Sequence, residues 1–95
     1  MKAKNVELIS AKYMNEQNPE TFEIPTNDEL DKISVGSLVK VCANRERFWV
    51  EVVDLENDWF IGKVNNNLLL TYEHQIMLDD LIIFRKHNVY EIWQD

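Results

Sequence analysis

Apolar and polar residues alternate with a period of two through much of residues 36–95, and this pattern predicts β-strands. The runs rich in β-branched and aromatic residues are 38–43, 47–54, 59–64 and 81–84, the last of which is apolar throughout. The strongest is 47–54, in which Phe48, Val50 and Val52 share one face. Because the first three runs follow one another closely, with short polar segments between them, they predict an antiparallel meander.

The first 35 residues are more polar, and they predict short helical pieces. Thr26 and Glu29 form a capping-box pattern, which predicts a helix near 26–34. Residues 11–14 suit a second short helix, which Pro19 would end because its ring clashes with the preceding turn. The N-terminal part of the chain is therefore expected to carry a short α element.

Three further segments are expected to be extended. Residues 6–9 would start a strand, and residues 21–24, which include Phe22, alternate over a short stretch. Residues 89–93 would close the chain as a short strand or a single turn. These segments add to the sheet without changing its predicted antiparallel core.

The elements predict one domain over residues 1–95, because the sequence contains no internal repeat or linker. Within it, residues 1–35 form a mixed lead-in and residues 36–95 form the β core. The fold class is α+β, mostly β. We expect a small antiparallel meander curled into an SH3-like or OB-like barrel, with the N-terminal α element covering one side.

Turns in this chain must be made largely without glycine, since it has only two glycines. Asparagine tolerates the left-handed region and bonds its own backbone, so it is the expected substitute. Asparagines that fall between apolar runs are Asn44, Asn57, Asn65, Asn66, Asn67 and Asn88. We expect them to mark turns.

The charge of the chain limits its partners. Ten basic and 17 acidic residues give a formal charge of −7, which argues against binding to a phosphate backbone. No apolar run approaches the roughly 20 residues of a membrane-spanning helix. We therefore expect a cytoplasmic protein with a protein partner, without a membrane partner and without a nucleic-acid partner.

Residues with catalytic or metal-binding chemistry are few and lie in no recognised spacing. His74 and His87 fall in predicted loops, where solvated side chains are expected, and Cys42 falls on a strand as a structural residue. No glycine-rich phosphate loop, nucleophile elbow or paired-cysteine motif occurs. The sequence therefore predicts neither an enzyme nor a cofactor or metal site.

Aromatic and charged residues gather around the strongest predicted strand. Those that form the candidate interaction surface are Arg45, Glu46, Arg47, Trp49, Glu51 and Trp59. A tryptophan beside charges on an open sheet face is a typical anchor for a protein partner. The favoured function is a non-enzymatic protein-binding module.

Three alternatives stay open at this point. One is an immunity-type or inhibitor protein that neutralises a basic partner, since acidic charge steers such association. Another is an acidic mimic of nucleic acid. The last is a small-ligand binder with a pocket near Trp49, His74 and Asp80, an idea that rests on fold analogy alone.

Several segments also resemble a known family in their order and spacing. They are 18–25, 36–41, 46–52, 62–66, 78–84 and the pair Val89 and Ile92. Over about residues 15–93 the chain is similar to a bacterial domain of unknown function, number 2314. One departure is Asp79, which stands where glycine would precede the aspartate, so the turn there would be made by Asp79 and Asp80. The resemblance implies a small β-rich bacterial domain and no catalytic residue.

Overall fold

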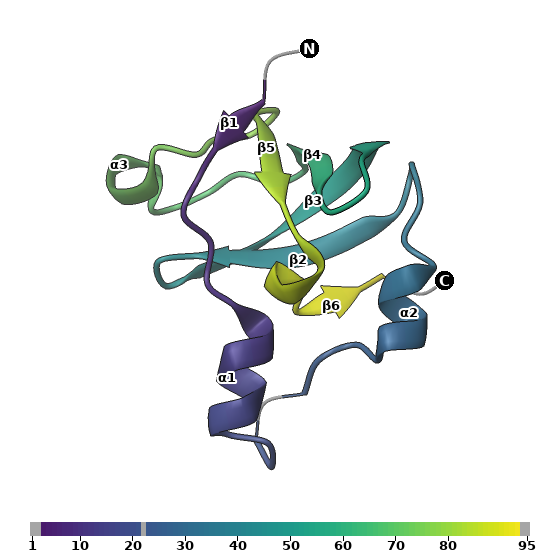
Figure 1. The fold of residues 1–95 in the computed structure, drawn as a ribbon. Helices are drawn as coiled ribbons and strands as arrows, with labels where there is room; N and C mark the ends of the chain where they lie inside the picture. The colour runs from purple at the N-terminus through teal and green to yellow at the C-terminus, as the bar shows by residue number, and fades with distance from the viewer. Residues whose placement is uncertain (1–2, 22, 94–95) are drawn as a thin grey trace.

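Four consecutive strands form the centre of the sheet, and the first three of them are the predicted meander (Figure 1). The computed structural model describes residues 3–21 and 23–93. The central strands, each antiparallel to the next, are β2 (Leu38–Ala43), β3 (Glu46–Leu55), β4 (Phe60–Val64) and β5 (Leu81–Phe84). The predicted antiparallel meander is therefore confirmed.

Two short edge strands complete an open, mixed, six-stranded sheet with the order β1-β5-β4-β3-β2-β6. β6 (Glu91–Ile92) pairs antiparallel with β2, which agrees with the predicted closing strand. β1 (Lys4–Asn5) pairs parallel with β5 and makes the sheet mixed. The prediction of a strand start at residues 6–9 is wrong: Val6 and Leu8 follow β1 and pack against the core instead.

Helices occur where the N-terminal signals predict them. α1 (Ala11–Gln17) is capped by Ser10, and α2 (Asn27–Asp31) begins after Thr26. The capping box is complete, because the Thr26 hydroxyl accepts from the Glu29 N–H and the Glu29 carboxylate accepts from the Thr26 N–H. These bonds hold the pKa of Glu29 below its ordinary value. α2 is shorter than the predicted 26–34 helix, and the predicted extended position of Phe22 lies outside the described residues.

The hydrophobic core lies against the inward face of the meander. Phe48, Val50 and Val52 point into it, as the alternation predicts. Gly62 on β4 faces the same core, where a Cβ atom would lie 2.8 Å from the Phe84 ring and 3.1 Å from Val50. A side chain at this position would therefore separate β4 from its neighbours.

Turns without glycine are made as expected at two positions. Asn44 joins β2 to β3 with φ 55°, and Asp79 precedes β5 with φ 71°. Both residues occupy the left-handed region, which short polar side chains tolerate better than most. Asn88 has a different role, because its buried amide accepts from the Arg85 N–H and donates to the Ile9 carbonyl.

Candidate functional site

The segment between β4 and β5 forms an Ω-loop over residues 65–79, whose ends meet. The Val64 N–H donates to the Asp80 carbonyl at 2.9 Å, and the Asp79 N–H donates to the Val64 carbonyl at 3.0 Å. The loop contains the short helix α3 (Thr71–His74), which stands out from the sheet on the side away from α2 (Figure 1).

Glu46, at the start of β3, anchors the Ω-loop to the sheet. Its carboxylate accepts from the backbone N–H groups of Leu69 at 2.7 Å and Leu70 at 2.8 Å. The same carboxylate lies 3.0 Å from Nε2 of His74. Only 12% of the Glu46 side chain is exposed, so this anchor is largely enclosed by the loop that it holds.

His74 is enclosed, with 4% of its side chain exposed. The Ile76 N–H donates to His74 Nδ1 at 3.1 Å, so this nitrogen must carry a lone pair. Nε2 is therefore the nitrogen that donates to Glu46. The prediction of a solvated loop histidine is wrong for His74, because Glu46 and the Ω-loop close around it, whereas His87 is exposed as expected.

The pKa values of both anchoring carboxylates of the loop, Glu46 and Asp80, are lowered. Burial works to raise the pKa of Glu46, but the hydrogen bonds from Leu69, His74 and Leu70 outweigh it and hold that pKa below its ordinary value. At the end of the loop, burial likewise opposes ionisation of Asp80. The hydrogen bonds from Lys4 and the Met77 N–H, together with the Lys4 charge, lower its pKa.

The interior of the Ω-loop is stabilised both by hydrogen bonds and by the packing of a buried apolar side chain. Ile76 is completely buried, and its carbonyl accepts from the Thr71 hydroxyl at 2.6 Å. Asn66 accepts from the Trp49 N–H at 2.8 Å, and the Trp49 carbonyl accepts from the Asn65 N–H at 2.9 Å. Hydrogen bonds at both ends and at the centre thus attach the loop to the sheet.

The same loop also exposes apolar side chains to solvent. Its exposed large hydrophobic side chains are Leu69 (84% exposed), Tyr72 (78%), Met77 (53%) and Leu78 (42%). These are four of the eight such side chains in the described chain, so exposed apolar surface is concentrated in this loop. Sequence reasoning did not single them out; the signal that could have done so is the run Leu68-Leu69-Leu70 inside an irregular segment.

The predicted interaction residues are brought together only in part. Arg45 is 79% exposed at the β2–β3 turn, and its guanidinium lies 3.4 Å from the Glu73 carboxylate of α3. Glu46 is occupied as the anchor and is not presented to a partner. Trp59 precedes β4 at the opposite end of β3 and lies in a different groove, so it does not join Arg45 in one surface.

The remaining predicted residues lie along the outer face of β3. The guanidinium of Arg47 lies 4.8 Å from the centre of the Tyr90 ring. Trp49 meets Trp93 edge-on, with ring centres 5.7 Å apart, and the Lys40 ammonium lies 4.8 Å from the Trp49 ring centre. Glu51 is exposed farther along the strand. These side chains form a mixed, partly paired surface beside the Ω-loop.

Two pockets are lined by residues that the structure describes. Neither of them is lined by Trp49 or Asp80. The smaller one, about 550 Å³, borders His74, whose side chain is already occupied by Glu46 and Ile76. The ligand pocket expected near Trp49, His74 and Asp80 is therefore not formed by either of them. Within residues 3–21 and 23–93, no three His, Cys, Asp or Glu side chains lie close enough together to hold a metal ion.

Comparisons with other proteins identify no relative: no family model matches the chain, and neither curated proteins nor solved structures give a significant match. Across the described part of the chain, no helix has the length and apolar character needed to cross a membrane. The geometry of the Ω-loop and of the grooves is therefore the basis for any functional argument.

Proposed function

We propose that the protein is a non-enzymatic protein-binding module, and that the outer side of the Ω-loop contacts the partner. The observation that carries this proposal is the contrast between the two sides of the loop. Its inner side is anchored by Glu46 and packed through Ile76, while its outer side presents Leu69 and Tyr72 to solvent. An anchored loop with exposed apolar side chains suits a binding surface.

The energetics favour such a surface. Complete burial of an apolar side chain such as Leu69 contributes roughly 1.5–3 kcal/mol, and a tyrosine adds a large amphipathic ring. Because the loop is already ordered by its own hydrogen bonds, binding would order little additional backbone. Arg45, exposed beside α3, supplies a charged rim to this apolar centre.

The test uses a photo-crosslinking residue at Tyr72 in the full chain, expressed in the source cells. We expect a defined protein to be crosslinked and its purified form to bind the unmodified chain in calorimetry. Leu69→Asp should abolish that binding. Tyr13→Ser is the matched control, because Tyr13 is 58% exposed on α1 and should leave the affinity unchanged. Equal binding by the Leu69→Asp variant and the unmodified chain would refute the proposal.

We also propose that the sheet is curled toward a barrel. The Ile9 N–H donates to the Cys42 carbonyl at 2.9 Å, so the segment after β1 reaches from the β5 edge to β2. This link supports the proposal of an SH3-like or OB-like barrel architecture. The bacterial source and the cytoplasmic location stay proposals from the sequence alone. The resemblance to domain 2314 stays a proposal, which an alignment of that family around Glu46–Val52 would test.

A further inference from the structure

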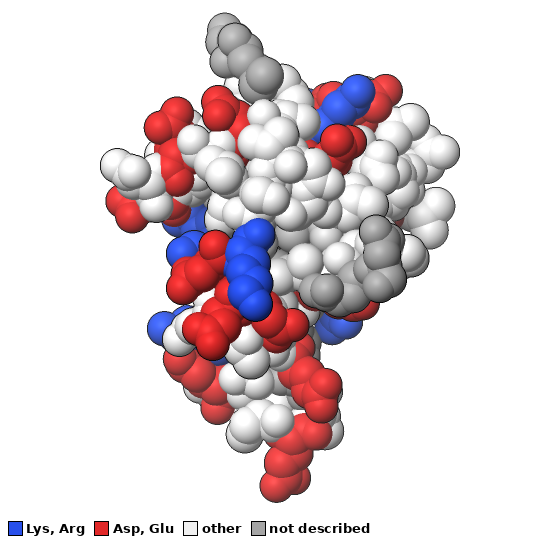
Figure 2. Space-filling model, turned by 90° about the vertical axis from the view of Figure 1, so that its right-hand side faces the viewer, with Lys and Arg blue, Asp and Glu red and all other residues white. Residues whose placement is uncertain are grey.

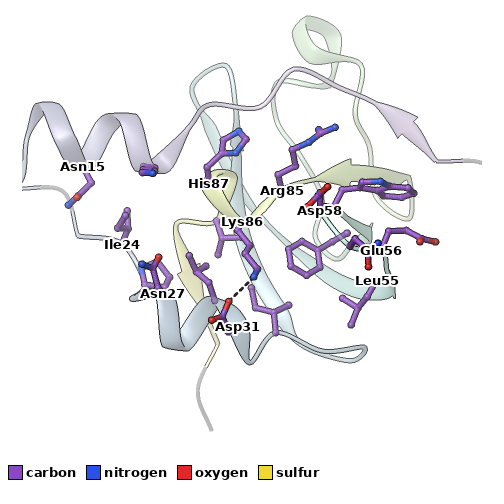
Figure 3. Close-up of a pocket in the computed structure, with 18 of the residues that line it drawn as sticks. Asn15, Ile24, Asn27, Asp31, Leu55, Glu56, Asp58, Arg85, Lys86 and His87 are labelled. Carbon is purple, nitrogen blue, oxygen red and sulfur yellow. Dashed lines mark hydrogen bonds and ion pairs between the residues drawn. The ribbon is translucent and has the colours of Figure 1, made fainter.

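A groove of about 800 Å³ lies on the side of the molecule away from the Ω-loop (Figure 3). Its lining residues come from α1, the Ile24–Pro25 segment and α2, and from the β3–β4 turn and the 3₁₀ helix η1 (Lys86–Asn88). This size is within the range of pockets that hold small molecules or peptide side chains.

Part of the lining of the groove is apolar and reaches the core. It includes Phe60 and Val89, which are buried core residues, together with the half-buried Leu30 and the exposed Leu55 at the end of β3. Trp59 adds a half-buried aromatic ring. This apolar lining can cover an apolar side chain of a bound molecule and exclude water from it.

One ion pair crosses the groove. Lys86 Nζ lies 2.7 Å from Asp31 Oδ1, which joins η1 to α2. Figure 3 shows this pair in the middle of the groove, with Glu56 and Asp58 toward one end and Asn15 toward the other. Lys86 is thus paired with an acid within the groove.

The β3–β4 end of the groove, which carries Glu56 and Asp58, favours a cationic group of an occupant. With Lys86 and Asp31 paired, the charged lining residues are the acids Glu16, Glu56 and Asp58 and the bases Lys12 and Arg85. The stretch 48–62, which includes the β3–β4 turn, contains four acidic residues and no basic one. On the face that carries α2, acidic side chains cover much of the lower part, while basic ones are scattered (Figure 2).

We propose that this groove binds a short segment of a basic protein. An apolar side chain of that segment rests on Leu30, Leu55 and Phe60, and a neighbouring Lys or Arg reaches Glu56 and Asp58. The Trp59 ring adds a cation–π contact for the same basic side chain. The net charge of −7 steers a basic partner toward the protein and repels an acidic one.

The test measures binding of labelled peptides to the full chain by fluorescence anisotropy. The probe alternates leucine with arginine. Matched peptides replace arginine with glutamate or leucine with serine. We expect the Leu/Arg peptide alone to bind, and Glu56→Gln with Asp58→Asn to weaken it about tenfold. The matched control, Glu7→Gln with Glu51→Gln, makes the same change of net charge outside the groove and should weaken binding less than about twofold.

Backbone amide shifts in NMR locate the same peptide. We expect the peptide to change the backbone amide chemical shifts of Leu30, Leu55 and Arg85. The proposal is overturned if no peptide binds, if the Leu/Glu peptide binds equally well, if both double variants weaken binding equally, or if the shifts fall on the Ω-loop. Leu69→Asp should leave peptide binding unchanged, so failure here and failure of the Ω-loop surface are distinguishable.

Discussion

Replacing Glu46 with glutamine should destabilise the protein by removing the anchor of the Ω-loop. The carboxylate accepts three hydrogen bonds, from the Leu69 N–H, the Leu70 N–H and His74 Nε2. A glutamine has one carbonyl oxygen, and its NH₂ group would face at least one of these donors. The substitution therefore removes the charge and leaves an enclosed N–H without an acceptor.

The expected loss of unfolding free energy follows from these contacts. Loss of a hydrogen bond to a charged group costs about 1.5–3 kcal/mol, and an unpaired enclosed donor adds a penalty of similar size. Because Glu46 is 12% exposed, water reaches part of the carboxylate and reduces the effect. We expect about 2–3 kcal/mol in total, which for a domain of this size lowers Tm by roughly 10–20 °C.

The assay is urea unfolding followed by circular dichroism, together with hydrogen exchange at the Ile76 amide. Glu51→Gln is the control, because Glu51 lies exposed on the same strand and should change stability by less than about 0.5 kcal/mol. The Ile76 amide should exchange faster in Glu46→Gln, since its acceptor His74 loses its own partner. If Glu46→Gln is as stable as Glu51→Gln, the anchor does not hold the loop.

Three further outcomes follow from the structure. Because the pKa values of Glu46 and Asp80 are lowered in the fold, the stability that they contribute is present above their ordinary values of 4.5 and 3.8 and is lost as pH falls below them. Urea unfolding from neutral to acidic pH should show this loss, and a flat profile there would contradict it. Gly62→Ala should cost about 1–3 kcal/mol in thermal unfolding, since its Cβ would overlap the Phe84 ring, and a neutral effect would show that β4 yields easily. Burial and the neighbouring Cys42 raise the pKa of Tyr90 to about 12, so absorbance titration should show one tyrosine ionising later than the others.

The charge distribution along β3 changes the interpretation of its surface. The sequence places Arg45, Arg47, Trp49 and the acids near Trp59 close together along the chain. A ten-residue strand spans roughly 30 Å, however, so the basic and acidic ends of β3 face different surroundings. The basic end adjoins the Ω-loop, and the acidic end adjoins the groove. The single interaction surface predicted from the sequence is therefore two separate surfaces, one at each end of β3.

The sequence by itself determined the features that depend on neighbouring residues. Apolar runs rich in β-branched and aromatic residues located β2, β3, β4 and β5, and the alternation within β3 assigned its side chains to two faces. The capping box located α2, and short polar residues marked the left-handed turns at Asn44 and Asp79. Each of these signals is complete within a few residues.

Only the tertiary structure decided which side chains are presented and which are enclosed. Glu46 and His74 are 28 positions apart in the chain. Without the contact that joins them, both side chains would be expected to face solvent. The parallel pairing of β1 with β5 and the groove between α2 and the β3–β4 turn likewise join distant segments. Such contacts depend on how the whole chain closes around its core, so a local pattern of polar and apolar residues does not contain them.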